Sequence, residues 1–127
     1  MRRAWVSRTV AAPAGVVWAL LVDVDRWQEW GPSIRSAAVS GGSDFGLGTR
    51  GTVTTVVGVR LPFEVTGFEP GRAWSWRVAG VPATDHEVES VDAQHCRVRF
   101  GAPWIAAAYL VVCELALRRI DHLATAP

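Results

Sequence analysis

Two side chains in the second half of the sequence have the chemistry for acid–base work, His86 and Tyr109. An imidazole can act as a general base or orient a carbonyl near neutral pH. A tyrosine hydroxyl can donate a hydrogen bond to an oxygen that gains charge in a reaction. Both also have a structural explanation, because a buried histidine or tyrosine needs a hydrogen-bond partner in any case. The elements that hold them decide whether both face one interior.

His86 lies in an alternating segment that predicts one strand of a hairpin. The loop at 92–94 places Glu87 opposite Arg99, with a second acid–base pair beside it. Opposed residues share a face, so the other face of the hairpin pairs His86 with Phe100. The sequence therefore predicts that His86 points inward, among apolar residues.

Two earlier turns extend this register. Placing Arg77 opposite Asp85 sets Trp76 beside His86, and a type II turn over 69–72 sets Glu64 beside Arg77. The charged row is then the outer one. The predicted inner surface consists of Phe63, Val65, Trp74, Trp76, Val78, His86, Val88, Cys96, Val98 and Phe100. The turn after residue 57 leaves the faces of residues 51–57 open.

Tyr109 lies in the C-terminal segment, Pro103 to Thr125, which we expect to form one long helix. Pro103 suits a first helical turn, and an uninterrupted apolar run from Ile105 to Cys113 follows. The apolar run is too short for a membrane span, which needs about 20 residues. Charged residues then recur at helical spacing, at Glu114, Arg118 and Asp121, and the opposite side gives a predicted buried stripe of Ile105, Tyr109, Val112, Ala116, Ile120 and Leu123.

The remaining segments complete an α+β chain. A first strand is expected over Trp5–Val10, followed by a short helix, Pro13–Val22, and a second helical turn in which Asp25 and Gln28 resemble a capping box. Alternating segments separated by Gly and Pro turns fill residues 34–100. The expected fold is a single domain, 1–127, with a curved antiparallel sheet of about seven strands wrapped around the C-terminal helix.

Composition excludes several partners. The net charge of +1 gives no basic surface for a nucleic acid. No apolar leader is evident, so a cytoplasmic location is expected. Cys96 and Cys113 lack metal-ligand spacing and are expected to be buried free thiols. No cofactor motif is present, and the acidic residues Asp23, Asp25 and Glu29 are interpreted as helix caps rather than as a metal site.

Several of these segments resemble one known family. They are Val10–Pro13, Val17-Trp18, Glu29–Pro32, the turn Phe68–Arg72 with the tryptophans after it, and the long C-terminal helix. Together they resemble the START-like (SRPBCC, Bet v 1-like) superfamily, closest to its polyketide cyclase/dehydrase-like branch. The resemblance implies a helix-grip fold with a cavity between the sheet and the long helix. Members of that fold bind lipids, quinones, hormones or polyketides, so the fold alone does not fix the function.

The leading functional hypothesis is the binding or transport of a small hydrophobic molecule, including a polycyclic or polyketide-like one, by a monomer or homodimer. The expected ligand-binding residues are Trp30, Phe63, Val65, Trp74, Trp76, Val88, Val98, Phe100, Val112 and Ala116. The alternative is a cyclase or dehydratase without a cofactor, in which His86 is the general base and Tyr109 the hydrogen-bond donor. A second alternative is a protein-partner module with an exposed apolar patch near Trp27.

One departure from the family pattern weighs against the enzymatic alternative. Some aromatase/cyclases of the family hold a ketide oxygen with an arginine inside the cavity. In this sequence Arg77, Arg97 and Arg99 all fall on the predicted outer row.

Overall fold

The computed structural model describes residues 3–41, 44–103 and 109–126. Its strands are β1 (Arg3–Val10), β2 (Ile34–Val39), β3 (Arg50–Thr55), β4 (Arg60–Glu69), β5 (Ala73–Val78), β6 (Val81–Asp92) and β7 (His95–Pro103). Its helices are α1 (Ala14–Val22), the 3-10 turn η1 (Val24–Arg26), α2 (Trp27–Trp30) and α3 (Leu110–Thr125). The expected order of strand, short helices, six strands and long helix is confirmed.

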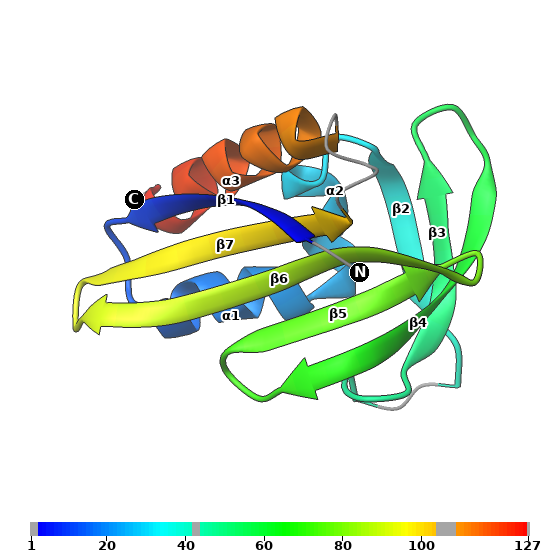
Figure 1. Cartoon of the computed structure of the whole chain (residues 1–127), viewed down its shortest axis with the longest axis horizontal. Coiled ribbons are helices and arrows are strands. Elements are labelled where there is room, and N and C mark those ends of the chain that lie inside the picture. The colour runs from blue at the N-terminus through cyan, green and yellow to red at the C-terminus, as the bar shows by residue number, and fades with distance from the viewer. Residues whose placement is uncertain (1–2, 42–43, 104–108, 127) are drawn as a thin grey trace.

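The seven strands form one antiparallel sheet in the order β1-β7-β6-β5-β4-β3-β2. Figure 1 shows α3 running alongside β1 and β7, while β2 and β3 turn across the far end of the sheet. The sheet is therefore strongly curved, and its concave face and α3 enclose the core. This is the Bet v 1-like arrangement that the resemblance implies.

The predicted register of the last hairpin is correct. Glu87 pairs with Arg99 and His86 with Phe100, and the Arg99 Nη1 to Glu87 Oε1 distance is 3.1 Å. The pairing of Glu64 with Arg77 across β4 and β5 is also confirmed. These registers hold because each hairpin matches charge with charge on one face and apolar with apolar on the other.

The predicted pairing of Arg77 with Asp85 is wrong. Ser75 pairs with Asp85 and Trp74 with His86, and a bulge separates Ser75 from Arg77. The turn between β5 and β6 is tighter than expected, because Ala79 and Gly80 both have positive φ, of 52° and 77°. Near His86 the observed register differs from the predicted one by two residues. An even shift leaves the same side chains of β6 on the inner face.

Two expectations for α3 are also corrected. Pro103 does not begin the helix: it is the buried last residue of β7, opposite Arg3. The expected helical residues 104–108 lie outside the described residues. The buried face of α3 is Cys113, Ala116, Leu117 and Ile120, so the predicted burial of Ala116 and Ile120 is confirmed. Tyr109 is exposed and Val112 is half-buried, contrary to the prediction.

The rotation of α3 has a physical cause. Asp121 was expected on the solvent side, but its Oδ2 lies 2.6 Å from Arg8 Nε on β1. This ion pair fixes the Asp121 side of the helix against the sheet edge, and Leu117, one turn earlier, is fully buried. Tyr109 is 39% exposed at the helix N-terminus.

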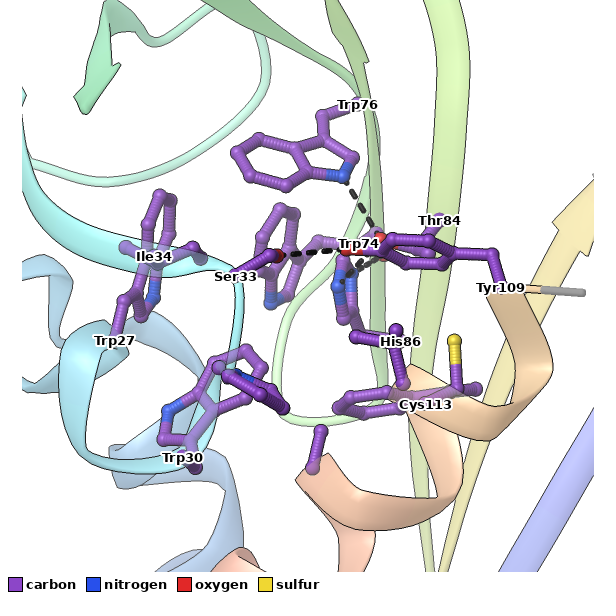
Figure 2. A pocket seen from close by; sticks show the side chains of 15 residues that line it. Trp27, Trp30, Ser33, Ile34, Trp74, Trp76, Thr84, His86, Tyr109 and Cys113 are labelled. Carbon is purple, nitrogen blue, oxygen red and sulfur yellow. Dashed lines mark hydrogen bonds between the residues drawn. The ribbon is translucent and has the colours of Figure 1, made fainter. Parts of the chain in front are cut away.

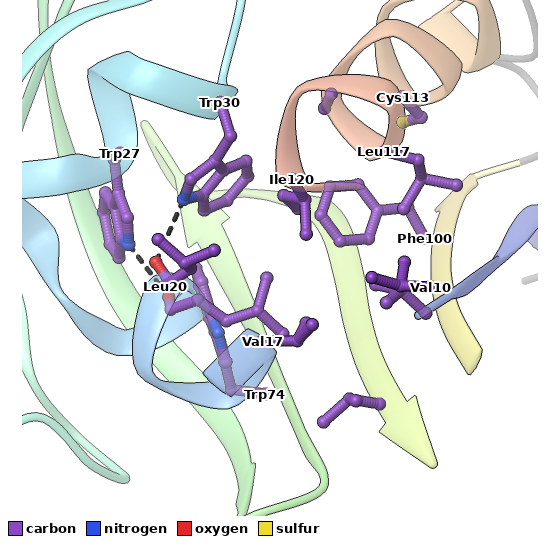
Figure 3. Packing of buried hydrophobic residues seen from close by; sticks show 14 of the residues in the cluster. Val10, Val17, Leu20, Trp27, Trp30, Trp74, Phe100, Cys113, Leu117 and Ile120 are labelled. Atoms are coloured by element: carbon purple, nitrogen blue, oxygen red, sulfur yellow. Dashed lines mark hydrogen bonds between the residues drawn. The ribbon is translucent and has the colours of Figure 1, made fainter. Parts of the chain in front are cut away.

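The short helices hold the tryptophans that fill the concave face. Trp27 Nε1 donates to the Leu21 carbonyl at 2.9 Å, and Trp30 Nε1 donates to the Leu20 carbonyl at 3.0 Å (Figure 3). These carbonyls lie in the last turn of α1, which has no helical partners for them. The expected cap at Asp25 is wrong, because Asp23 Oδ1 accepts the Asp25 N–H instead, at 3.1 Å.

Cys96 and Cys113 are free and buried, as expected. Within the described ranges, no helix has both the length and the apolar character needed to cross a membrane.

Candidate functional site

A small enclosed space, the inner pocket, lies between α2, the start of β2, the sheet and α3 (Figure 2). Its volume is about 30 Å³, which is room for little more than a water molecule. Its lining residues come from elements far apart in sequence: Trp27, Trp30, Gly31, Pro32, Ser33, Ile34, Trp74, Trp76, Thr84, His86, Phe100, Tyr109, Val112, Cys113 and Ala116. In this structure, aromatic side chains fill most of the cavity.

A second and larger space, the outer groove, adjoins it at the curved end of the sheet. Its volume is about 270 Å³. It is lined by Ser33, Ile34, Val53, Thr54, Thr55, Leu61, Trp76, Val78, Ala83, Thr84 and Tyr109. Five of these residues, Ser33, Ile34, Trp76, Thr84 and Tyr109, also line the inner pocket. The groove and the pocket are therefore neighbouring parts of one site.

The structure brings most of the predicted site residues to the inner pocket. Trp30, Trp74, Trp76, His86, Phe100, Tyr109, Val112 and Ala116 line it. Phe63, Val65, Val88 and Val98 are buried in the surrounding core and do not line the pocket. Trp27 is fully buried, so the exposed apolar patch expected near it is not formed by its side chain.

His86 is held from both ring nitrogens. Nδ1 lies 3.1 Å from the Trp74 carbonyl, and Nε2 lies 3.0 Å from Thr84 Oγ1. A carbonyl only accepts, so Nδ1 carries the proton and Nε2 accepts from the Thr84 hydroxyl. Thr84 Oγ1 in turn accepts from Trp76 Nε1 at 3.0 Å. The direction of every hydrogen bond in this chain is thereby fixed.

Burial keeps His86 neutral. The side chain is 2% exposed, and removal from water lowers its pKa from 6.5 to about 3, against a smaller opposing effect of the bond to the Trp74 carbonyl. Its ring stacks on Trp74 with centroids 3.9 Å apart. At neutral pH His86 is thus an uncharged imidazole with both nitrogens engaged inside the protein.

An aromatic stack forms the floor of the pocket. Trp74 lies between His86 and Trp27, and the two indole rings are 5.2 Å apart and nearly parallel. Trp74 Nε1 is buried and has no hydrogen-bond partner within the described part of the chain. Trp30 and Phe100 pack edge to face and close the adjacent side of the pocket. The side chain of Trp74 is therefore held by ring packing, between two neighbours that are themselves hydrogen-bonded.

Tyr109 and Ser33 meet at the boundary between the two spaces. Tyr109 Oη lies 2.9 Å from Ser33 Oγ, and the pair connects the N-terminus of α3 to the segment before β2 (Figure 2). Either hydroxyl can be the donor. Tyr109 is therefore at the mouth of the inner pocket, rather than inside a buried stripe.

Sequence reasoning missed the outer groove. Thr84 is one groove residue that could have been predicted from the sequence, because it lies two residues before His86 and so faces the same side of the sheet. Val78 was placed on the predicted inner surface, and Leu61 has the strand parity of Phe63. Ser33 and Ile34 follow a Gly-Pro turn, so local alternation gives no signal for them. Their convergence depends on the curvature of the sheet.

No group of three His, Cys, Asp or Glu side chains among the described residues is placed to hold a metal ion. Glu29 instead pairs with Arg26, with Nε and Oε2 2.8 Å apart. The lining residues of the groove and the pocket offer apolar contacts and hydroxyl groups.

A sequence model of one family, described as "Polyketide cyclase / dehydrase and lipid transport", matches residues 1–121. No curated protein sequence matches the chain.

Solved structures share the fold at low sequence identity. Protein XoxI from Bacillus cereus is 15% identical with a TM-score of 0.77, over 99% of this chain and 97% of that one. The Zhui aromatase/cyclase from Streptomyces sp. R1128 is 16% identical with a TM-score of 0.72, over 97% and 93%. The di-domain ARO/CYC BexL from the BE-7585A biosynthetic pathway is 20% identical with a TM-score of 0.76, over 100% of this chain and 48% of that one.

Proposed function

We propose that this chain, which belongs to the polyketide cyclase/dehydrase and lipid transport family, binds a small hydrophobic molecule between its sheet and α3. The observation that carries the proposal is the outer groove, which is lined mainly by apolar side chains and adjoins the inner pocket. Its volume, about 270 Å³, is close to the lower end of the range for small-molecule sites, roughly 300–1,000 Å³.

In this proposal the ligand lies in the outer groove, and one end points toward the aromatic floor of the inner pocket. Trp76 is shared by both spaces, and Trp30, Trp74 and Phe100 form the floor. Val112 and Ala116 supply the α3 side. A planar aromatic or polyketide-like molecule suits such a wall, and two structural relatives are described as aromatase/cyclases.

The state of His86 supports binding over proton transfer. A general base needs a free lone pair and a pKa near the working pH. The Nε2 lone pair of His86 accepts from Thr84, and its pKa is about 3. A cyclase or dehydratase mechanism through His86 would have to break this bond first, whereas binding needs no such change.

The test uses 2-acetylnaphthalene, an uncharged aromatic probe, and isothermal titration calorimetry. Val78 lines the groove, so Val78→Trp should fill it and weaken binding by tenfold or more. Val91→Trp is the matched control, because Val91 is 57% exposed and lines neither space. Equal affinity of the probe for wild type and a folded Val78→Trp would contradict the proposed site.

A further inference from the structure

The charge and hydroxyl content of the site indicate the chemical class of its ligand. We infer that the site selects an uncharged, largely apolar molecule with one hydrogen-bond acceptor oxygen, and that it excludes carboxylates. This inference rests on the proposed function and deepens it, because it concerns the same groove and pocket.

The first argument is the absence of charge. None of the described residues that line the outer groove or the inner pocket is Asp, Glu, Lys or Arg. Arg35 and Arg60 adjoin the lining residues Ile34 and Leu61 in sequence, but both are exposed and neither contributes to the lining. A bound carboxylate would thus have no cationic partner, and an unpaired ion in an apolar site carries a large desolvation cost.

The titratable lining residues stay neutral as well. They are His86, Tyr109 and Cys113. Burial lowers the pKa of His86 to about 3 and raises that of Cys113 to about 11. Burial also raises the pKa of Tyr109, against a smaller opposing effect of Ser33. At neutral pH the site therefore presents no charge of either sign to a ligand.

The second argument is a count of hydroxyl protons. The proton of Thr84 is used on His86 Nε2, and the indole proton of Trp76 is used on Thr84. Ser33 and Tyr109 bond to each other, which uses one of their two hydroxyl protons whichever residue donates. Among the residues shared by groove and pocket, one O–H is then left over within the described contacts. Thr54 and Thr55 line the outer groove alone, away from this junction, and are outside the count. A single ligand oxygen, such as a ketone, can accept it.

This count predicts an unusual mutational pattern. Removing either hydroxyl, in Tyr109→Phe or Ser33→Ala, frees the proton of the other one, so each single variant keeps one donor. Only the double variant has no free donor at the junction of groove and pocket. A neutral hydrogen bond of typical strength corresponds to about a fivefold change in affinity. The loss should appear in the double variant and be small in either single one.

The experiment compares three probes of similar shape by calorimetry at pH 7.5. They are 2-acetylnaphthalene, which carries one acceptor, 2-ethylnaphthalene, which carries none, and 2-naphthoate, which is an anion. Wild type should bind the ketone about fivefold more tightly than the ethyl compound. It should bind the anion at least a hundredfold more weakly than the ketone.

The double variant Ser33→Ala/Tyr109→Phe provides the decisive control. It should bind the ketone and the ethyl compound equally, so that the roughly fivefold preference of wild type for the ketone is lost. A loss for both compounds would show a structural effect and overturn the assignment of the oxygen contact. Binding of 2-naphthoate as tight as that of the ketone would overturn the exclusion of carboxylates while the proposed function stands. Failure of all three probes to bind would overturn the proposed function itself.

Discussion

A histidine that is buried in its neutral form couples folding to pH, and His86 has this property. Its folded pKa of about 3 lies below the value of 6.5 expected in the unfolded chain. Between these values the unfolded state binds one more proton than the folded state. The stabilisation is therefore complete above pH 6.5 and is lost as the pH falls toward 3.

We predict that this residue contributes a slope of about 1.4 kcal/mol per pH unit to the free energy of unfolding between roughly pH 6 and pH 4. Urea denaturation of wild type and His86→Gln over this range measures it, because glutamine can donate to the Trp74 carbonyl and accept from Thr84 but does not titrate there. The slope of the variant should be flatter by that amount. Identical slopes for wild type and His86→Gln would refute the assignment.

The inward orientation of His86 was predictable from strand alternation, because a charged outer row and an apolar inner row leave one consistent register. Its cross-strand hydrogen bond was not predictable, because Nδ1 reaches the Trp74 carbonyl on β5 and this contact depends on the register of the two strands. Nε2 reaches Thr84, which lies two residues earlier on the same strand.

At the level of elements, α3 contains two leucines in different environments. Leu117 is fully buried, whereas Leu115 is 42% exposed. Truncating a buried leucine removes apolar burial and leaves a cavity, and the cost is about 2–5 kcal/mol.

Leu117→Ala should lower the free energy of unfolding by about 2–5 kcal/mol, and Leu115→Ala by less than about 1 kcal/mol. Both substitutions place alanine in the same helix, so helix propensity cancels in the comparison. Urea denaturation at neutral pH measures both values. Losses of equal size would mean that α3 is rotated from the position described.

The β4–β5 and β6–β7 hairpins were predictable because each turn and each charged pair lie close together in sequence. The register of the β5–β6 hairpin was not, because its tight turn and bulge shift the pairing. The start and the rotation of α3 were not. Pro103 is compatible with the first turn of a helix and with the end of a strand, and only its pairing opposite Arg3 decides between them. The rotation depends on Asp121 and Arg8, whose contact spans nearly the whole chain. The charged residues at helical spacing were predicted to face solvent, whereas one of them, Asp121, forms an ion pair with Arg8 on β1.

At the level of the whole molecule, the ion pair between Arg8 and Asp121 connects the first strand to the last helix. Asp121→Asn should destabilise the protein by about 1 kcal/mol, because a charge-assisted, half-buried hydrogen bond is lost. Glu114→Gln, which removes an exposed pair with Arg118 on the same helix, should cost less than about 0.5 kcal/mol. Chemical denaturation of the three proteins measures the difference. A larger loss for Glu114→Gln than for Asp121→Asn would contradict this ranking.

From the sequence, the site could be predicted only where its lining residues lie in regularly alternating strands of the sheet. The aromatic floor lies on the inner face that alternation predicts, while the outer groove draws Ser33, Leu61 and Val78 together through the curvature of the far end of the sheet. The volumes of the inner pocket and the outer groove could not be predicted from the sequence either, because they depend on how completely the tryptophans fill the concave face.

The position of β1 in the sheet has a consequence for synthesis in the cell. Arg3 to Val10 pair with Pro103 to Cys96, so the first strand made by the ribosome has as its only neighbour the last strand made. At about 5–20 residues per second, β1 waits for its partner for roughly 5–20 s, as does the concave face for α3. During that interval the nascent chain presents an unpaired strand and an uncovered cluster of tryptophans to molecular chaperones. The order of translation thus makes closure of the sheet by β1 and α3 a late step in the folding of these residues.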